Sequence, residues 1–470
     1  MRNTFNPLRA LGRASVIALA ALALATLAPA ADTNALPAAP PAPAPAGPVL
    51  PSRPLSLVEC QDIAVQQNAN VLKSQSDIEA TYGVAVQTRA VALPKLQSTG
   101  NYQFTDQFES LTIPGGPAVE MQKEHSWSAG IRLVQSIYEG GRITSALSTA
   151  RLTKEQALLQ HQTVLLDTLL TVRVAFYAVL QAEQQIIVQQ ASIKLLEKEL
   201  EDTTRRYNAG TVPRFNVLRA EVELGNAKPL LARARNAFRI GKNNLAIALG
   251  YRVPAGTWED IPLQLAGKLE AEPYEVELPA ALATALEKRP ELAVLRKARA
   301  LRAEAITSAK SGYKPSVQLF GGYGWRSSSF QNNYLITDVA GWTTGAQLTW
   351  NWFDGQSIKG KVQEAQALHQ KSGIEIDDRT RQIELEVRTG YSSFVEAKEV
   401  LESQKKVQEQ AEEALRLATA REDAGTGTQL DVLNAQTALT QARTTQIQAL
   451  HDYSVARARL ERAIGAGASR

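Results

Sequence analysis

The sequence predicts an α+β fold in which one unit, made of a helix, two strands, a very long helix and a returning helix, is repeated in tandem. Landmark residues recur at nearly constant offsets along the chain. Within each copy, the spacing of apolar residues changes from the helical period to the two-residue period of strands and back again. Each copy also contains a proline-free helical pattern, over 142–208 and 356–423, that is far longer than an average helix.

The N-terminus has the features of a cleavable secretory signal over residues 1–30. Three arginines precede an apolar run over 14–27, and a small-residue cleavage motif follows at 28–30. The run is shorter than the roughly 20 apolar residues of a membrane-spanning helix, so we favour cleavage over a membrane anchor. Residues 31–54 are rich in proline and alanine and lack apolar periodicity, which predicts an extended tether.

Charge and cysteine content exclude several classes of protein. Without the three arginines of the signal, the 51 basic residues become 48 against 47 acidic ones, a formal charge of +1, which does not indicate nucleic-acid binding. The single cysteine, Cys60, cannot form an internal disulfide, and Glu59 before it does not suit a lipoprotein signal, so we expect a small buried side chain. We expect no catalytic residue, metal, cofactor or enzyme activity, because metal-ligand spacing is lacking among the histidines, which are His125, His161, His369 and His451.

The duplication covers most of the chain. Leu57 matches Leu278 at an offset of 221 residues, whereas Gly210 matches Gly425 at an offset of 215, so a loop between the two blocks differs in length. The further matching pairs are Pro94 with Pro315, Gly100 with Gly321, Tyr102 with Tyr323, Trp127 with Trp342, Gly140 with Gly355 and Gly250 with Gly465. The predicted segments are a first repeat at 55–250, a connector at 251–275, a second repeat at 276–465 and a tail at 466–470.

Each repeat contains two stretches in which apolar and polar residues alternate, the pattern of a strand with one apolar face. Each stretch has about the 9 to 11 residues of a tilted transmembrane strand, although a sheet packed on a soluble core would show the same alternation. Four strands are too few for a barrel, and lipid does not tolerate an open sheet edge, so a membrane location requires partner chains. Two copies would supply 8 strands and three copies 12. The expected strands are 94–108, 124–137, 315–327 and 341–353.

The two long helical patterns carry a coiled-coil seam. Apolar residues, with one threonine, recur at spacings of 3 and 4 in the first repeat, and the equivalent positions of the second repeat are apolar as well. At 1.5 Å per residue each long helix spans roughly 100 Å, and the returning helices are about half as long. Gly225 and Pro229 predict a bend in the first returning helix that the second should lack. The seam positions are Thr168, Val172, Phe176, Val179, Ala182 and Ile186, with Ile383, Val387, Tyr391, Phe394, Ala397 and Leu401.

Matching turns end the two long helices, at 209–213 and 424–428. Gly210 and Gly425 occupy the position at which a residue in the left-handed conformation caps a helix. After the second turn, the run 428–431 has the pattern of a capping box for the returning helix, with a threonine followed three residues later by an aspartate. We refer to the two segments as the tip turns.

The order of elements, together with "AGT" in both tip turns, "DVLNAQ" after the second and "LSLVECQDIAVQQNANVL" at the start of the first repeat, resembles the TolC family of outer-membrane efflux ducts from Leu55 to Gly465. The resemblance implies a homotrimer in the bacterial outer membrane. Three chains would form a 12-stranded β-barrel on a 12-helix α-barrel with coiled-coil pairs, which extends into the periplasm and has the connector in its equatorial region. It also implies a periplasmic adaptor and an inner-membrane pump as partners.

A member of that family would conduct substrate passively to the exterior, as part of a tripartite efflux or type I secretion system. The family exports drugs, metal ions, small organic molecules or proteins, and a duct takes its selectivity largely from its pump. The alternative is a non-transporting envelope protein, such as a coiled-coil spacer or an adhesin anchored by a small oligomeric barrel. A spacer would need neither a polar inward face on every strand nor a duplicated glycine turn, which favours the duct.

The resemblance also assigns roles to residues of the tip turns. Family members hold the periplasmic aperture closed with an arginine and a tyrosine, whose places are taken here by Gly427 and Glu422, so this lock does not carry over. The residues expected to face the adaptor are Gly210, Thr211, Val212, Pro213, Gly425, Thr426, Gly427 and Thr428, and those expected to line the aperture are Asp431, Asn434, Asn216 and Glu422. Charges of opposite sign flank the two turns and either pair around the aperture or remain solvated; they are Arg205, Arg206 and Arg214, with Glu422, Asp423 and Asp431.

Overall fold

The computed structural model describes residues 53–104, 110–111, 114, 119–120, 125–252, 261–327 and 338–466. The chain divides into two units, Met1–Val49 and Leu50–Arg470, and every described residue belongs to the second. The expected signal and nearly all of the tether therefore lie outside the described residues. So do parts of the connector and of the tail, namely 253–260 and 467–470.

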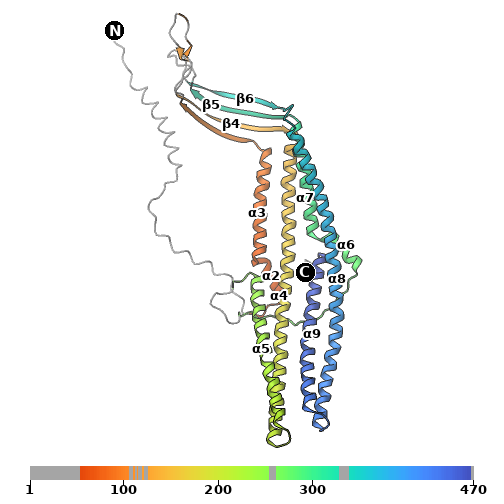
Figure 1. The fold of residues 1–470 in the computed structure, drawn as a ribbon. Coiled ribbons are helices and arrows are strands. Elements are labelled where there is room, and N and C mark those ends of the chain that lie inside the picture. The colour runs from red at the N-terminus through yellow and green to blue at the C-terminus, as the bar shows by residue number, and fades with distance from the viewer. Residues whose placement is uncertain are drawn as a thin grey trace, which may run out of the picture. The chain divides into compact units, whose positions relative to one another are not determined.

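Within the described residues, each repeat contains four α-helices and two long strands (Figure 1). In the first repeat these are α2 (Leu57–Gln67), α3 (Ala69–Arg89), β1 (Lys95–Phe104), β4 (His125–Glu139), α4 (Arg142–Asn208) and α5 (Arg214–Leu249). In the second they are α6 (Leu278–Lys288), α7 (Pro290–Lys310), β5 (Ser316–Ser327), β6 (Asp338–Thr349), α8 (Ser357–Asp423) and α9 (Gln429–Ile464). The short elements are the 3-10 helices η1 (Ala90–Ala92) and η2 (Ser311–Tyr313) and the strands β2 (Ser110–Leu111) and β3 (Val119–Glu120).

The helix that we expected before the first strand of each repeat is broken into two. In the first repeat, the Asn68 side chain accepts a hydrogen bond from the backbone N–H of Asn70 at 2.8 Å and donates one to the carbonyl of Ala248 at 2.7 Å, which separates α2 from α3. In the second repeat, the break falls at Arg289, because Pro290 disfavours the helical conformation of the residue before it. The break lets α2 and α6 pack across the middle of the long helices.

The strands differ from the expected ones at their ends. β6 ends at Thr349 rather than at 353, because its neighbour β5 begins at Ser316, directly opposite, and leaves the following residues without a partner strand. β4 continues to Glu139 beyond the expected 137, with a register shift near its end that is typical of a β-bulge. Two parts of the expected strands lie outside the described residues, 105–108 and 124.

The four long strands form one antiparallel sheet in the order β1-β4-β5-β6. The register joins residues of the same face, as in the row formed by Ile131, Tyr323 and Trp342. One face of the sheet is therefore apolar and the opposite face is polar. β1 and β6 are the edges of this sheet, and neither pairs with a second strand on its outer side within the described chain.

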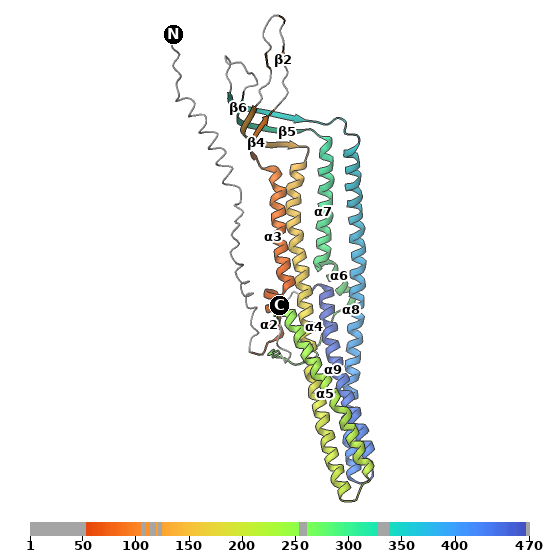
Figure 2. The same ribbon diagram turned by 60° about the vertical axis from the view of Figure 1, so that its left-hand side comes forward.

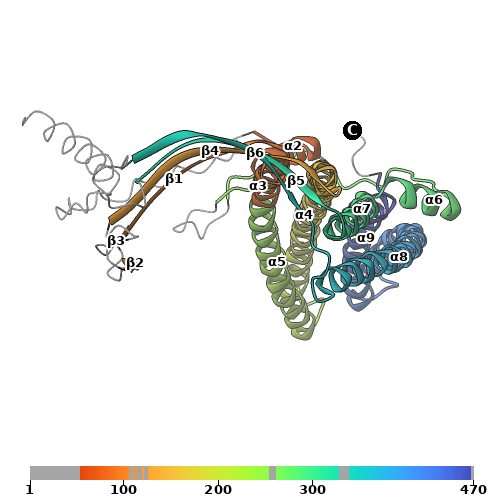
Figure 3. The same cartoon turned by 90° about the horizontal axis from the view of Figure 1, so that it is seen from above.

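The helices form a layer in which each long helix runs past two shorter ones (Figures 1 and 2). Near the sheet the packing order is α3, α4, α7 and α8, and toward the tip turns it is α5, α4, α9 and α8. In both rows α4 lies inside and α8 lies at one end. Seen along the helices, α5 and α8 lie at opposite sides of the layer (Figure 3).

The predicted seam forms the core between these helices. Its positions Val172, Phe176 and Val179 on α4 are buried, as are Ile383, Val387 and Phe394 on α8. The expectation that Cys60 is a small buried side chain is confirmed, and its burial raises the pKa of the thiol to about 12. α5 continues through Gly225 and Pro229 as a single helix, and the bend expected there remains a prediction.

Candidate functional site

The two tip turns have the same backbone geometry. Gly210 has a φ of 75°, and the N–H of Thr211 donates to the carbonyl of Arg206 at 3.0 Å. Gly425 has a φ of 72°, and the N–H of Thr426 donates to the equivalent carbonyl at 2.9 Å. An added Cβ at either glycine would meet nothing within 4 Å, so glycine is required for its backbone conformation rather than for space. The predicted left-handed caps are confirmed.

The helices that follow the two tip turns begin differently. The N–H of Thr428 donates to Oδ2 of Asp431 at 3.0 Å, and the N–H of Asp431 donates to Oγ1 of Thr428 at 3.3 Å, which confirms the capping box. The Thr428 hydroxyl, which donates to Oδ2 of Asp431 at 2.7 Å, and the Thr428 N–H together hold the pKa of the Asp431 carboxyl below its usual range. α5, by contrast, follows Pro213 without a side-chain cap.

One ion pair joins the ends of α4 and α8, directly before the two tip turns. Nη1 of Arg206 lies 2.7 Å from Oε1 of Glu422, and the side chain of Glu422 is only 10% exposed. Arg205 instead pairs with Asp202 on its own helix, at 2.8 Å. The charges flanking the two turns therefore make one contact between the turns, and it lies at the boundary between the two repeats of a single chain.

A second polar contact lies beside this ion pair. Nε2 of Gln429 donates to Oγ1 of Thr203 at 2.6 Å and to Oε1 of Glu199 at 3.1 Å. Burial raises the pKa of the Glu199 carboxyl, and the negative charge of Glu422 raises it further. The first residue of α9 is thus bound to α4 of the other repeat. A small apolar cluster adjoins this contact and contains Leu196, Leu224, Ala227 and Leu433.

The four residues expected to line an aperture have different surroundings. Asp431 and Asn434 are exposed on α9, and Asn216 is half-buried on α5. Glu422 is covered by its ion pair with Arg206. Our sequence reasoning missed Gln429 and its partners. The signal that could have revealed them is a difference between the repeats, because the position equivalent to Gln429 is Arg214 and the position equivalent to Glu199 is Ala414.

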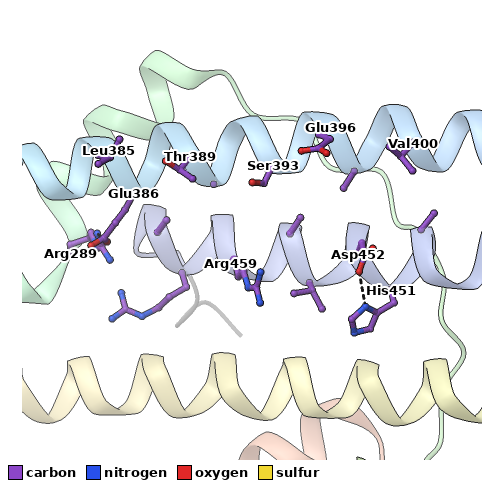
Figure 4. Close-up of a pocket in the computed structure, with 17 residues that line it drawn as sticks. Arg289, Leu385, Glu386, Thr389, Ser393, Glu396, Val400, His451, Asp452 and Arg459 are labelled. Carbon is purple, nitrogen blue, oxygen red and sulfur yellow. Dashed lines mark hydrogen bonds and ion pairs between the residues drawn. The ribbon is translucent and has the colours of Figure 1, made fainter. Parts of the chain in front are cut away.

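A groove lies between the middle of α8 and the C-terminal half of α9 (Figure 4). At one end of it Nη1 of Arg289 donates to Oε2 of Glu386 at 2.5 Å. At the other end Nδ1 of His451 faces Oδ1 of Asp452 at 3.0 Å. No hydrogen bond in the described chain joins His451 to Ser393, one of the two hydroxyl-bearing residues of α8 that line the groove. The described residues also contain no group of three ligands suited to a metal ion.

Buried charges connect the two repeats beside this groove. Nη2 of Arg462 lies 2.7 Å from Oδ1 of Asp167 and 2.7 Å from Oε1 of Glu291. Nη1 of Arg173 donates to Oε2 of Glu461 at 2.5 Å. The pairs of Arg462 with Asp167 and of Arg173 with Glu461 join α4 of the first repeat to α9 of the second, whereas Glu291 lies on α7 of the second repeat. Because Arg462 is 7% exposed, its charge depends on these carboxylates for compensation.

Comparison with known proteins agrees with this architecture. The chain is 22% identical over 430 residues to outer membrane protein TolC of Escherichia coli, covering 88% of this chain and 83% of TolC. It is 23% identical over 419 residues to the alkaline protease secretion protein AprF of Pseudomonas aeruginosa, covering 86% and 83% of the two chains. The crystal structure of the CmeC outer membrane channel of Campylobacter jejuni superposes with a TM-score of 0.73 at 14% identity, covering 87% of this chain and 86% of CmeC.

A family model supplies the assignment. The model for outer membrane efflux proteins matches residues 61–251 and 281–466, one block in each repeat. The matched blocks coincide with the two folded repeats and leave out most of the connector between them. The chain therefore belongs to the outer membrane efflux protein family and is an outer-membrane export channel.

Proposed function

We propose that three copies of this chain close into one continuous duct, which crosses the outer membrane as a β-barrel and the periplasm as a helical tunnel. A periplasmic adaptor and an inner-membrane pump would deliver substrate to it in a tripartite efflux or type I secretion system. The chain itself would supply a passive path and no energy.

One observation supports this proposal most directly. The two repeats contact each other once within the chain, and the equivalent surfaces at the two edges of the chain have no partner within the described residues. The first repeat contacts the second through β4 with β5, α4 with α7, and α4 with α9. The duplication makes β6 with β1, α8 with α3, and α8 with α5 the equivalent pairs. These elements lie at opposite ends of the sheet and of the helix rows. A second copy of the chain satisfies all three pairs at once.

The sheet has the surfaces that such a closure needs. Its apolar face would contact lipid and its polar face would line the channel, while edge-to-edge pairing removes the open backbone groups that lipid does not tolerate. Just beyond the end of β6, Trp350 and Trp352 lie with ring centroids 4.8 Å apart, and Trp352 is 85% exposed. Tryptophan side chains are typical of the boundary between lipid and water, so we place the periplasmic membrane surface at this level.

The tip turns would form the periplasmic end of the duct. We propose that the turn residues named above face the adaptor and that Asp431, Asn434 and Asn216 line the aperture. Glu422 would act there through its ion pair with Arg206, which fastens the two hairpins of one chain together. The exposure of Asp431 and Asn434 and the matched geometry of the two turns support this assignment.

Disulfide cross-linking tests the trimer. The native cysteine is buried and does not compete, so a variant with Asn101→Cys in β1 and Gln347→Cys in β6 places reactive thiols only at the two sheet edges. These positions are equivalent to Gly322 and Arg132, which face each other within the chain. Oxidation in membranes should yield trimers, and neighbouring positions on β6 should be tried to match the register between chains. The single variants, which lack a partner thiol on the facing edge, should yield none. A series that gives only dimers or monomers would contradict the threefold closure.

Channel conductance distinguishes the duct from a spacer or an adhesin. Purified trimers reconstituted in planar lipid bilayers should conduct ions. Intact trimers that never conduct would favour the non-transporting class, because a spacer needs no open path through its axis.

A further inference from the structure

The polar face of the sheet carries unusual charges. Besides small and uncharged polar residues and the apolar side chains of Val134, Phe320 and Val339, it carries three basic residues, Lys95, Arg132 and Arg326. Among strand residues whose side chains the structure describes, Glu139 is the only acidic one. It is buried at the end of β4, with Oε2 2.5 Å from Nε of Arg142. The uncompensated charge on this face is therefore positive.

The strand register places the three cations at successive levels. Arg132 lies two residues from the level of Lys95, and Arg326 lies four residues beyond Arg132 on the neighbouring strand. At about 3.4 Å per residue, the three levels extend over about 20 Å along the strands, which corresponds to about 15 Å of membrane thickness for strands tilted by roughly 40°. This is about half of the hydrocarbon core. Within the described chain, neither Arg132 nor Arg326 forms an ion pair or a side-chain hydrogen bond.

Arg132 is held in place by an aromatic ring and two glycines. Its guanidinium carbon lies 4.2 Å from the centroid of Phe320, a cation–π contact that leaves its N–H groups free. A Cβ at Gly345 would come within 2.8 Å of the Phe320 ring, and a Cβ at Gly322 would come within 2.5 Å of the carbonyl of Ile131. The "GGYG" run at 321–324 and Gly345 on β6 thus provide the space in which the side chains of Arg132 and Phe320 lie against the sheet.

We propose that Lys95, Arg132 and Arg326, here called the cation ladder, make the β-barrel selective for anionic cargo. Such cargo would be small organic molecules that carry carboxylate, sulfonate or phosphate groups. The inference rests on the proposed trimer, in which the polar face becomes the channel wall and the ladder is present three times. Charges of one sign that line a narrow path through a low-dielectric membrane raise the local concentration of ions of the opposite sign. The acidic groups at the tip act at the other end of the duct, so the barrel makes its own contribution to selectivity.

Reversal potentials in planar bilayers test the proposal. Wild-type trimers are measured in a KCl gradient and then with potassium benzoate replacing KCl, so that one probe is a small inorganic anion and the other an aromatic carboxylate. The variant Arg132→Gln with Arg326→Gln should lower the anion-to-cation permeability ratio about two-fold or more for both anions at low salt. At 1 M salt the difference should nearly vanish, because the screening length falls to about 3 Å.

The charge-conserving variant Arg132→Lys with Arg326→Lys is the matched control and should keep the wild-type ratio. A ratio that is unchanged in the glutamine variant, or lowered equally in the lysine variant, would overturn the inference while leaving the duct intact. Wild-type trimers without any conductance would contradict the proposed duct instead, so the two failures are distinguishable.

Discussion

The tip has two kinds of interface between repeats, one within a chain and one that the proposed trimer creates between chains. Within the chain, the ion pair of Arg206 with Glu422 joins α4 to α8, and the hydrogen bonds of Gln429 join α9 to α4. The duplication gives the equivalent residues between chains. Arg421 and Tyr207 replace the ion pair, and Arg214, Ala414 and Ala418 replace the hydrogen-bonded group. In the trimer, six helical hairpins would form a ring in which two kinds of boundary alternate. The boundary within a chain, which we call the fastened boundary, has the ion pair and the hydrogen bonds, whereas the boundary between chains lacks them. The aperture should therefore open at the boundaries between chains.

The same contrast extends to the middle of the molecule. α9 lies between α4 and α8 and buries residues along its whole length, whereas α5 lies at the end of its row and buries only half as many. Arg462 of α9 is 7% exposed, and its counterpart Ile247 of α5 is 64% exposed. A duplicated sequence thus diverged where one copy became internal to the chain and the other faced outward.

Removing the buried arginine should have the largest effect on stability. Arg462→Ala takes from Glu291, whose side chain is 14% exposed, its partner at 2.7 Å and leaves it Arg289 at 3.5 Å. Breaking a buried pair costs about 3 to 5 kcal/mol, and the remaining contact with Arg289 puts the expected loss near the lower value. The Asp167 side chain is 60% exposed, so the loss of its pair adds little. Arg459→Ala is the matched control, because Arg459 is exposed on the same helix and its loss should cost less than about 0.5 kcal/mol. Chemical unfolding in detergent, followed by circular dichroism, measures both. Equal destabilisation by the two variants would remove the distinction between the internal and outward faces of α9.

Breaking the fastened boundary should change conductance. Glu422→Gln removes the ion pair with Arg206, so the tip should open more readily and the conductance of the trimer should rise at low salt. The rise should be smaller at high salt, where screening already weakens the wild-type pair. Arg421→Gln changes the equivalent position between chains and should have little effect. The variant Glu422→Gln with Asp423→Asn should behave like Glu422→Gln alone.

Two outcomes would change this interpretation. Unchanged conductance in Glu422→Gln, with trimers intact, would place the constriction at Asp431 or elsewhere. A larger rise in Arg421→Gln than in Glu422→Gln would show that the boundary between chains holds the tip closed.

Local and repeated patterns in the sequence were enough to predict the elements of the fold. The long helices at 142–208 and 356–423 were expected within a residue of their ends, because apolar periodicity and capping glycines are local signals. Gln356 has a φ of 70° where the first repeat has Gly141, and without a glycine this turn residue gave no local sign of its conformation. The division of the leading helix was missed in both repeats. In the first repeat one bond of the Asn68 amide reaches a carbonyl 180 residues away, whereas in the second repeat Pro290 is a local signal that the sequence analysis did not use.

The candidate site was predictable only in part for the same reason. The capping box of Thr428 and Asp431 spans three residues and can be recognised in the sequence. The ion pair of Arg206 with Glu422 and the contact of Gln429 with Glu199 each join residues more than 200 positions apart. The sequence indicates charged residues beside both turns, but only the packing of α4 against α8 and α9 determines which residues meet.

The smallest expected effect is a pH dependence confined to the fastened boundary. Burial raises the pKa of the Glu199 carboxyl, so the folded chain holds this proton more tightly than the unfolded chain. Stability from this group is present at pH values below the ordinary pKa and falls as the pH rises through the raised value. Glu199→Gln should therefore stabilise the protein at pH 7 more than at pH 4, measured as the shift in unfolding midpoint relative to wild type. Glu197→Gln, exposed on the same turn of α4, serves as the control and should show no such difference. A Glu199→Gln variant that is less stable than wild type at pH 7 would contradict this prediction. It would mean that hydrogen bonds from Gln429 and Thr203 stabilise the ionised carboxylate by more than burial destabilises it. The contact between α4 and α9 would then be stronger at neutral pH than we expect.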